Sequence, residues 1–294
     1  MAIEEIKIKK ALNRLHSKFL PYKWDLNVYR GCSHRCQYCY ALYSHKYLES
    51  GKNFFETIYV KTNIVEALEK ELSSKRWKHE VINLGGVTDS YQSIEEKYEL
   101  MREVLKLMIK YKTPIVISTK SDLILRDVDL LTELAKVASV NVAVTITTMD
   151  ENIRKKIEPG ARPSEKRLEV LKKLSGKNIG LGLHLMPILP MITDSEENIE
   201  NIFRKVSTVP IDYAICGFLN LRSATRVNFL DFIKRDFPNL LDDYLKLYQS
   251  PFIKKEYAKN IYEKIWRLKK KYNIKSDYKK NLPKERVIKQ LNLL

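Results

Sequence analysis

The chain has 294 residues, of which 44% are hydrophobic and 30% are charged, and its formal net charge is +17. This composition is typical of a globular protein with a sizeable core, and the length suits one large α/β barrel or two modest domains. No apolar run approaches the roughly 18 residues that a membrane-spanning helix needs. The N-terminus, MAIEEIKIKK, lacks the apolar core of a secretory signal, so we expect a cytoplasmic protein with no membrane partner.

The positive charge is unevenly distributed along the chain. Residues 254–286 contain 13 Lys or Arg against 4 Asp or Glu, a net +9 within 33 residues. A polyanionic partner such as nucleic acid would explain this concentration. A lysine-rich, solvated surface would explain it too, and the composition leaves both interpretations open.

Short runs rich in Val, Ile and Thr alternate with segments of helical periodicity for most of the length. The runs predict six buried strands: 24–29, 80–86, 113–119, 140–148, 179–187 and 211–221. A strand–helix alternation this regular predicts parallel βαβ units. Six strands are two fewer than a full eight-fold barrel has, so a partial barrel and a doubly wound sheet both remain open.

From residue 223 onwards the pattern is helical only. Within 252–272, apolar residues at three- and four-residue steps form one stripe on a basic helix. We therefore expect two domains: a barrel with an N-terminal extension, 1–222, and a basic helical extension, 223–294, that packs on it. Five aromatic residues lie among the lysines of the extension: Tyr257, Tyr262, Trp266, Tyr272 and Tyr278. They are either stacking platforms for single strands and flipped-out bases, or core residues of the packing stripe.

Three of the four cysteines fall within eight residues, on the loop after the first predicted strand: Cys32, Cys36 and Cys39. Three thiolates select zinc or an iron–sulfur cluster. A zinc site needs a fourth ligand, which His34 or His45 could supply, whereas a three-thiolate [4Fe–4S] cluster leaves one iron open for another ligand. The remaining cysteine, Cys216, lies alone in an apolar run and is expected to be a small core residue. His34 and His184 are expected to be satisfied polar groups.

The spacing C-x3-C-x2-C followed by an aromatic residue resembles the signature of the radical S-adenosylmethionine (SAM) superfamily. Four segments resemble its spore photoproduct lyase-like family, often labelled DNA repair photolyases: NVYRGCSHRCQYCYA, VTDSYQSIE, STKSDLILRDVDLL and IEPGARPSEKRLEVLKKL. The similarity extends from about Asn27 to Pro190. It implies an α/β fold, a partial (β/α)6 TIM-like barrel of parallel strands, here followed by the all-helical C-terminal extension. It also implies a [4Fe–4S] cluster held by the cysteine triplet, with SAM on the open iron.

The resemblance further implies an activity. One electron from the cluster cleaves SAM, and the 5′-deoxyadenosyl radical abstracts hydrogen from a substrate; an electron donor such as ferredoxin or flavodoxin supplies the electron. In the lyases a cysteine after the second strand is thought to return hydrogen to the product, and that position is Val87 here. Three functions stay open: a lyase-like radical enzyme on damaged or modified nucleic acid, a radical enzyme on a peptide, protein or small metabolite, and a non-catalytic, metal-stapled nucleic-acid-binding module.

Cofactor contacts follow from the same resemblance. Gly85 and Gly86 match the glycines that receive the methionyl amino group of SAM, and glycine lets a ligand approach the backbone closely. Lys120 matches a lysine that meets the SAM carboxylate. Tyr40 matches an aromatic residue that packs on the adenine.

The remaining candidates are polar residues later in the barrel and one tyrosine of the cysteine loop. Thr145 and Thr147 match small polar positions near the ribose and the carboxylate. Arg167 either grips the SAM carboxylate or pairs with Glu158 to hold a loop. Tyr38 is the one candidate for a catalytic side chain, because the radical itself comes from the cofactor.

Overall fold

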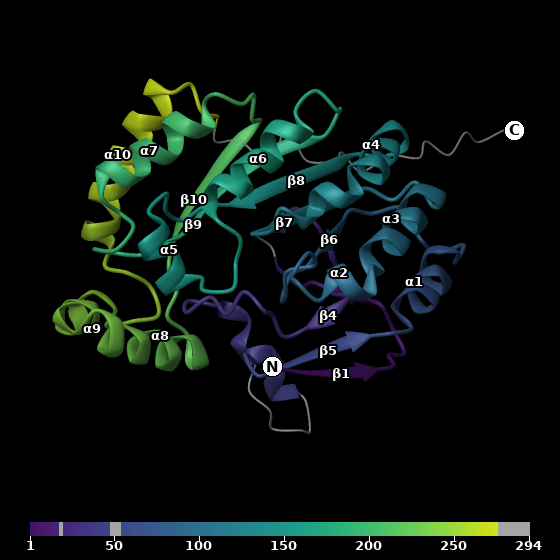
Figure 1. The fold of residues 1–294 in the computed structure, drawn as a ribbon, viewed down its shortest axis with the longest axis horizontal. Coiled ribbons are helices and arrows are strands. Elements are labelled where there is room, and N and C mark those ends of the chain that lie inside the picture. Colours follow the sequence, from purple (N-terminus) through teal and green to yellow (C-terminus); the bar gives the residue numbers. More distant parts are fainter. Residues whose placement is uncertain (18–19, 48–53, 276–294) are drawn as a thin grey trace, which may run out of the picture.

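The structure is a computed structural model that describes residues 1–17, 20–47 and 54–275 (Figure 1). Its centre is a seven-stranded sheet in the order β10-β9-β8-β7-β6-β3-β2. Six of these strands are parallel and follow one another in chain order: β3 (Trp24–Leu26), β6 (Ile82–Leu84), β7 (Ile115–Thr119), β8 (Val140–Thr145), β9 (Gly180–Ile188) and β10 (Tyr213–Phe218). The partial (β/α)6 barrel and five of the six predicted strands are confirmed, while the first, predicted over 24–29, is only three residues long in the barrel sheet. Because the strand order never reverses, the doubly wound alternative is excluded.

Helices connect the parallel strands and cover one face of the sheet (Figure 1). The main crossover helices are α1 (Ile64–Leu72), α3 (Leu100–Lys110), α4 (Val128–Val137), α6 (Ser164–Leu174) and α7 (Glu196–Val206). Two shorter helices, α2 (Glu95–Tyr98) and α5 (Glu151–Ile157), lie in the loops. On the covered face Ile117, Val142 and Leu181 are in register on neighbouring strands, and all three are buried. This row forms part of the core beneath α4 and α6.

The first strand of the N-terminal extension joins two later strands in a second sheet that sequence patterns did not reveal. This sheet has the order β1 (Ala2–Ile6), β5 (Thr57–Lys61), β4 (Tyr29–Arg30), while β2 (Leu12–Arg14) pairs antiparallel with β3. The prediction of one strand over 24–29 was therefore wrong. The chain leaves the barrel sheet after β3 because Asn27 makes other hydrogen bonds. Its carbonyl accepts from Lys61 Nζ at 2.6 Å, and its Oδ1 accepts from the backbone N–H of Val87 at 2.9 Å.

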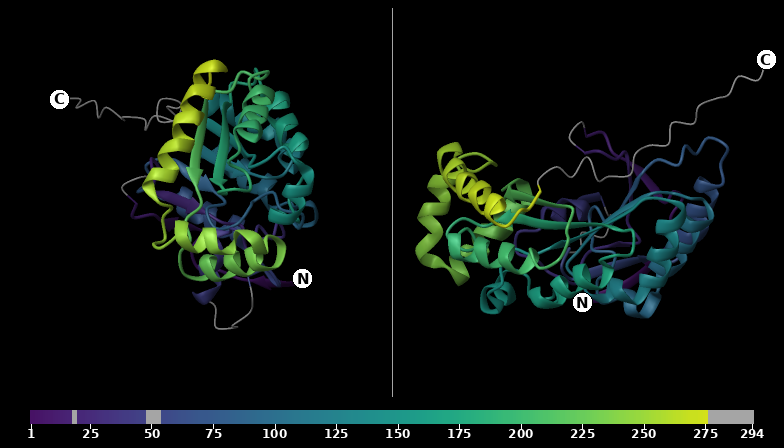
Figure 2. Two further views of the ribbon diagram at one scale, coloured as in Figure 1. Left: turned by 90° about the vertical axis from the view of Figure 1, so that its left-hand side faces the viewer. Right: turned by 90° about the horizontal axis from the view of Figure 1, so that it is seen from above.

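The C-terminal extension contains α8 (Ser223–Asp236), η3 (Pro238–Leu240), α9 (Leu241–Leu247) and α10 (Lys255–Lys271). Helix α10 runs beside the sheet and contacts α7 (Figure 2). Its apolar stripe is buried at Ile261, Ile265 and Leu268, as predicted. The chain after α10 then bonds the outer strand, where the carbonyl of Lys275 accepts from the N–H of Ala214. The division into two domains at residue 222 stays a prediction.

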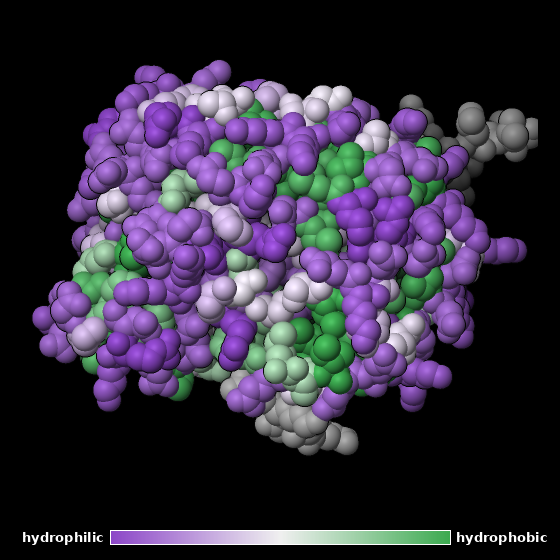
Figure 3. All heavy atoms as spheres, in the orientation of Figure 1, coloured by the Kyte–Doolittle hydropathy of each residue, from purple (hydrophilic) through white to green (hydrophobic). Residues whose placement is uncertain are grey.

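One face of the molecule can be judged by its hydropathy. On the face drawn in Figure 3, hydrophilic residues predominate and hydrophobic residues form separate patches between them. Within the described ranges, none of the helices has the length and apolar character to cross a membrane.

Candidate cofactor site at the cysteine loop

The cysteine triplet lies on the loop between β4 and η1 (Tyr40–Tyr47). Cys32 and Cys36 are buried, Cys39 is half-buried, and none is in a disulfide. Burial, reinforced by the nearby Asp89, raises the pKa of the Cys32 thiol to about 12, and burial also raises the pKa of Cys36 and Cys39. Buried thiols of this kind become thiolates when a metal centre displaces their protons. The donor set therefore fits a metal cluster.

The first half of the cysteine loop is held by the segment after β6. Gln92 accepts a hydrogen bond from the backbone N–H of Ser33 at 2.7 Å and donates to the carbonyl of Gly31 at 3.1 Å. The hydroxyl of Thr88 donates to the same carbonyl at 2.6 Å. The segment VTDSYQSIE, which carried part of the family resemblance, thus fixes the backbone that presents Cys32.

The second half of the loop rests on the segment after α5. The N–H of Gly160 donates to the carbonyl of His34 at 3.0 Å, and the N–H of Gln37 donates to the carbonyl of Ile157 at 2.9 Å. A Cβ atom at position 160 would lie 2.0 Å from the carbonyl oxygen of Ser33. Only glycine permits this approach, which gives the EPG turn a physical role next to the cysteines.

Glu158, in that same turn, joins three elements through one carboxylate. It accepts hydrogen bonds from the hydroxyl of Tyr38 in the cysteine loop and from that of Thr147 after β8, the latter at 2.9 Å, and it pairs with Arg167 Nη2 at 2.5 Å. Burial opposes ionisation of Glu158, but the charges of Arg167 and Lys120 outweigh it and lower its pKa to about 2. Glu158 is therefore an ionised carboxylate that ties the loop to the barrel.

Arg167, which forms the ion pair with Glu158, is fully buried. Besides Glu158, its guanidinium donates to the carbonyl of Thr145 at 2.9 Å and to that of Arg162 at 2.8 Å. Of the two readings that the sequence left open, these contacts favour the structural pair over a grip on the cofactor. The hydroxyls of Tyr38 and Thr147 are likewise engaged by Glu158.

Lys120 is a half-buried cation next to the cysteines, just after β7. Its ammonium lies 6.0 Å from the ring centroid of Tyr38, and among the described residues it makes no hydrogen bond or ion pair with a carboxylate. Burial opposes its charge, yet Cys36, Glu158 and Asp89 together raise the pKa of Lys120. A protonated, partly desolvated amine that has anionic neighbours but no direct bond to a carboxylate in the described ranges suits an anionic ligand.

Neither histidine near the triplet completes a zinc site. His34 Nδ1 faces Asp89 at 3.4 Å, and burial lowers its pKa to about 4, so it is neutral at pH 7. The ring of His45 packs against Phe54 and Tyr59, with centroids 4.9 and 5.6 Å apart. In the part of the chain that the structure describes, no three His, Cys, Asp or Glu side chains converge as they would around a single ion. A [4Fe–4S] cluster does not need such convergence, because each thiolate binds a different iron.

The glycine pair ends β6 in a tight turn. Gly85 has a φ of +92°, which favours glycine. A Cβ atom on Gly86 would lie 2.4 Å from the Asp25 carboxylate, which also accepts from the N–H of Gly86 at 3.1 Å. Asp25 is therefore the acid that supports this turn, from the neighbouring strand β3.

Tyr40 is brought onto the same turn. Its hydroxyl donates to the carbonyl of Gly86, while its side chain is 63% exposed. The structure thus groups Tyr40 with Gly85 and Gly86 and leaves Tyr40 accessible, and the cofactor contacts of all three stay predictions.

The model of the radical SAM superfamily matches residues 26–204, which include the cysteine loop and all of the strands from β6 to β9. The chain belongs to the radical SAM superfamily. That membership implies a [4Fe–4S] cluster and SAM, and the matching cysteine set is present in Cys32, Cys36 and Cys39.

Relatives of this radical SAM protein are found in bacteria and archaea. An uncharacterized protein of Mycobacterium tuberculosis is 32% identical over 285 residues, covering 95% of this chain and 83% of the relative. An uncharacterized protein of Methanocaldococcus jannaschii is 33% identical over 238 residues, covering 80% of this chain and 84% of the relative.

Among solved structures, spore photoproduct lyase is similar in fold. Its complex with dinucleoside spore photoproduct aligns with a TM-score of 0.65 at 15% identity, over 92% of this chain and 79% of the lyase. A double mutant of the lyase with AdoMet and the same dinucleoside aligns with a TM-score of 0.67 at 14% identity, over the same shares of the two chains. Identity this low shows a shared fold.

The inner face of the radical SAM barrel is polar, although barrel interiors are usually filled by Val, Ile and Leu. Ser118 bonds His184 Nδ1 at 2.9 Å and lies 3.5 Å from the hydroxyl of Thr145. Farther along, the hydroxyl of Tyr213 donates to Asn141 at 2.7 Å. Burial and the charge of Lys120 lower the pKa of His184 to about 4, so this face presents neutral hydrogen-bonding groups.

Cys216 lies outside this radical SAM site. It is half-buried and packs against the main core near α10, whereas the other cysteines belong to separate clusters. Burial raises the pKa of its thiol even though Lys269 is nearby.

Sequence patterns missed the residues that support the radical SAM cofactor site from behind: Asp25, Asn27, Gln92 and Gly160. One signal was present, since Asp25 is an acid in the middle of an otherwise buried strand, and buried acids need partners. The others make contacts over more than fifty residues, which local patterns do not encode.

Proposed function

We propose that Cys32, Cys36 and Cys39 hold the [4Fe–4S] cluster and that SAM binds between Lys120 and the Gly85–Gly86 turn. When bound, the cluster and SAM would supply one-electron reductive cleavage of the sulfonium and, through it, hydrogen abstraction from a substrate. The observation that carries this proposal is Lys120: a half-buried ammonium beside Cys36 that has no carboxylate partner in the described ranges.

Each neighbouring residue has a defined task in this proposal. Lys120 binds the SAM carboxylate by a charge-assisted hydrogen bond. The Gly85–Gly86 turn, supported by Asp25, offers backbone to the methionyl ammonium, and the exposed ring of Tyr40 stacks on the adenine. Thr145 lies on the inner face, within reach of a ligand there.

Glu158 and its partners orient the site from behind. Arg167 and Thr147 hold the carboxylate, and the carboxylate holds Tyr38 between two of the cysteines. This arrangement keeps charged and polar groups fixed before ligands arrive, which lowers the cost of ordering them.

For the substrate, we propose damaged or modified nucleic acid. The net charge of +17 supports a polyanion, and the fold is shared with a lyase whose solved complex contains a dinucleoside. Because Val87 has no S–H hydrogen to give, we do not extend the lyase reaction itself to this chain. We further propose an external electron donor of the ferredoxin or flavodoxin type and a reducing, cytoplasmic setting for the thiols.

Anaerobic turnover tests the proposal directly. Cluster-loaded protein is reduced with dithionite in the presence of SAM, and 5′-deoxyadenosine is quantified by mass spectrometry, with and without ultraviolet-irradiated DNA. We expect slow formation without DNA and faster formation with it. Protein that carries a full cluster and forms no 5′-deoxyadenosine would contradict the enzyme assignment; formation that DNA does not accelerate would contradict the substrate.

A further inference from the structure

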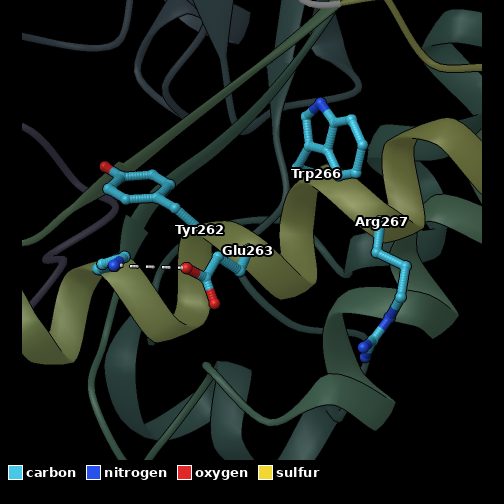
Figure 4. A pocket seen from close by; sticks show the side chains of 5 residues that line it. Tyr262, Glu263, Trp266 and Arg267 are labelled. Carbon is cyan, nitrogen blue, oxygen red and sulfur yellow. Dashed lines mark ion pairs between the residues drawn. The ribbon is translucent and has the colours of Figure 1, made fainter.

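Helix α10 has a second face, opposite its packing stripe, that presents aromatic rings to solvent. Tyr262 and Trp266 lie one turn apart, so their side chains project from the same side of the helix (Figure 4). Trp266 is 68% exposed and Tyr262 is 42% exposed. Both line a surface groove together with Lys259, Glu263 and Arg267. Large exposed aromatic residues side by side on a helix indicate a binding surface.

The structure separates these two rings from the other aromatic residues of the extension. Tyr257 donates its hydroxyl to Asp194 at 2.5 Å, and Tyr272 donates to Glu200 at 2.9 Å, so both anchor the helix to the barrel. Tyr278 lies outside the described residues. The ring of Tyr262 is fixed by an edge contact with Phe218, with centroids 5.3 Å apart. A ring fixed in this way costs little entropy when a ligand stacks on it.

The charges around the two rings favour an anionic ligand. Helix α10 contains seven Lys or Arg and two Glu, a net +5 over Lys255–Lys271. Lys270 Nζ lies 5.6 Å from the ring centroid of Trp266, and Lys259 lies one turn before Tyr262. Lys259 is 4.0 Å from Glu263 in an exposed pair, which holds it only weakly. Cation, ring, ring and cation therefore follow one another along the helix at three- and four-residue steps.

We propose that this α10 stripe, formed by Lys259, Tyr262, Trp266 and Lys270, binds single-stranded nucleic acid. Two neighbouring bases stack on the two rings, and the flanking ammonium groups contact phosphates, the combination that single-strand-binding surfaces use. Aromatic anchors of protein interfaces insert into pockets of the partner, whereas a stripe in which cations and rings alternate matches the phosphates and planar bases of a single strand. The inference deepens the proposed function and rests on it only for the chemistry that follows binding.

Fluorescence anisotropy with a labelled oligo(dT) strand tests this directly on the full-length, cluster-loaded protein. We expect Trp266→Ala to weaken binding about 10- to 100-fold, since stacking on an aromatic ring contributes that much per base. Trp266→Phe keeps an aromatic face and is expected to retain most of the affinity. Leu245→Ala on α9 removes an exposed apolar side chain outside the stripe, 43% exposed, and serves as the control with unchanged affinity.

Two further measurements separate the contribution of the aromatic rings to binding from that of the lysine charges. Lys259→Gln and Lys270→Gln are each expected to reduce the slope of log Kd against log salt by about 0.7, the value for one single-strand phosphate contact. Heparin, a polyanion without bases, is expected to bind wild type and Trp266→Ala equally. Melting temperature and iron content establish that each variant is folded.

The outcomes distinguish this inference from the proposed function. Wild-type affinity of Trp266→Ala for oligo(dT), or equal losses for oligo(dT) and heparin, would overturn base stacking. Loss of ferredoxin binding in Trp266→Ala while oligo(dT) binding persists would overturn the proposal by assigning the stripe to a protein partner. Protein that cleaves SAM but does not bind oligo(dT) refutes the α10 stripe alone; protein that binds oligo(dT) but never cleaves SAM refutes the enzyme alone.

Discussion

The cysteine-loop end of the barrel and the outer face of α10 both place a lysine near an aromatic ring, in opposite surroundings. Lys120 lies 6.0 Å from the Tyr38 ring and is half-buried; Lys270 lies 5.6 Å from the Trp266 ring and is exposed. Screening by water makes an exposed charge contribute little individually, whereas partial burial strengthens each interaction. The two lysine–aromatic pairs have similar distances, but their interaction energies therefore differ. Single substitutions at the cysteine loop should have large effects, and the α10 stripe should act through several weak contacts.

The largest effect is expected at the cysteines, which test whether the buried end is a cluster site at all. Cys32→Ala, Cys36→Ala and Cys39→Ala should each remove most of the iron, because each replaces one of only three thiolate ligands. Iron and sulfide analysis of anaerobically reconstituted protein measures this. Cys216→Ala, packed against the main core near α10, is the matched control and should keep full iron. Full iron in the three loop variants would contradict the ligand assignment.

The next effect concerns the buried ion pair behind the loop. Glu158→Ala leaves the Arg167 guanidinium buried without its counter-charge, and we expect the free energy of unfolding to fall by about 3–5 kcal/mol. Denaturant titration measures this loss. Glu169→Ala removes an exposed pair with Lys166 and should cost at most about 1 kcal/mol. If both variants lost the same free energy of unfolding, the buried ion pair would not be more important for stability than the exposed one.

A smaller effect is expected for the cofactor contact of the half-buried lysine. Lys120→Ala should weaken SAM binding about 10- to 100-fold, since a hydrogen bond to a charged group contributes about 1.5–3 kcal/mol. Equilibrium dialysis with anaerobic, cluster-loaded protein measures the affinity, and iron content should not change. Lys106→Ala, an exposed lysine of α3, is the control. Unchanged affinity would exclude Lys120 from the site.

The smallest effect is a pH dependence from the inner face. The pKa of His184 is lowered to about 4 in the folded protein, against about 6.5 when unfolded, so the unfolded chain takes up the proton first. Its contribution to stability is therefore complete above about pH 6.5 and is lost as the pH falls towards 4, by at most about 1.4 kcal/mol per pH unit. Denaturant titration across this pH range gives the free energy of unfolding of the wild type and of His184→Gln, and the difference between the two isolates the contribution of His184.

The exposed His16→Gln variant is the control for this measurement, since it changes a histidine without changing the inner face. A wild-type minus His184→Gln difference that stays constant from pH 6.5 to 4 would show that His184 titrates normally, and hence that the inner face is open to water.

Much of the fold was predictable because periodicity and composition act within a few residues. Val, Ile and Thr runs located six strands, apolar steps located the packing stripe of α10, and the spacing of Cys32, Cys36 and Cys39 indicated the family. The strand prediction failed where distant contacts decide: β3 ends early because Asn27 bonds to Lys61 and Val87, which are far away in the sequence and which a strand pattern does not contain.

The sequence by itself determined the alternation of strands and helices and the motif of three cysteines, while it left the strand order open between a partial barrel and a doubly wound sheet. Only the tertiary structure decided what surrounds them. Tyr38 and Glu158 are 120 residues apart and meet in one hydrogen bond, Asp25 supports Gly86 from another strand, and Lys120 lacks a carboxylate partner in the described ranges. Such contacts form because the barrel brings the ends of distant strands to one edge, and their strength depends on a burial that exists only in the folded chain.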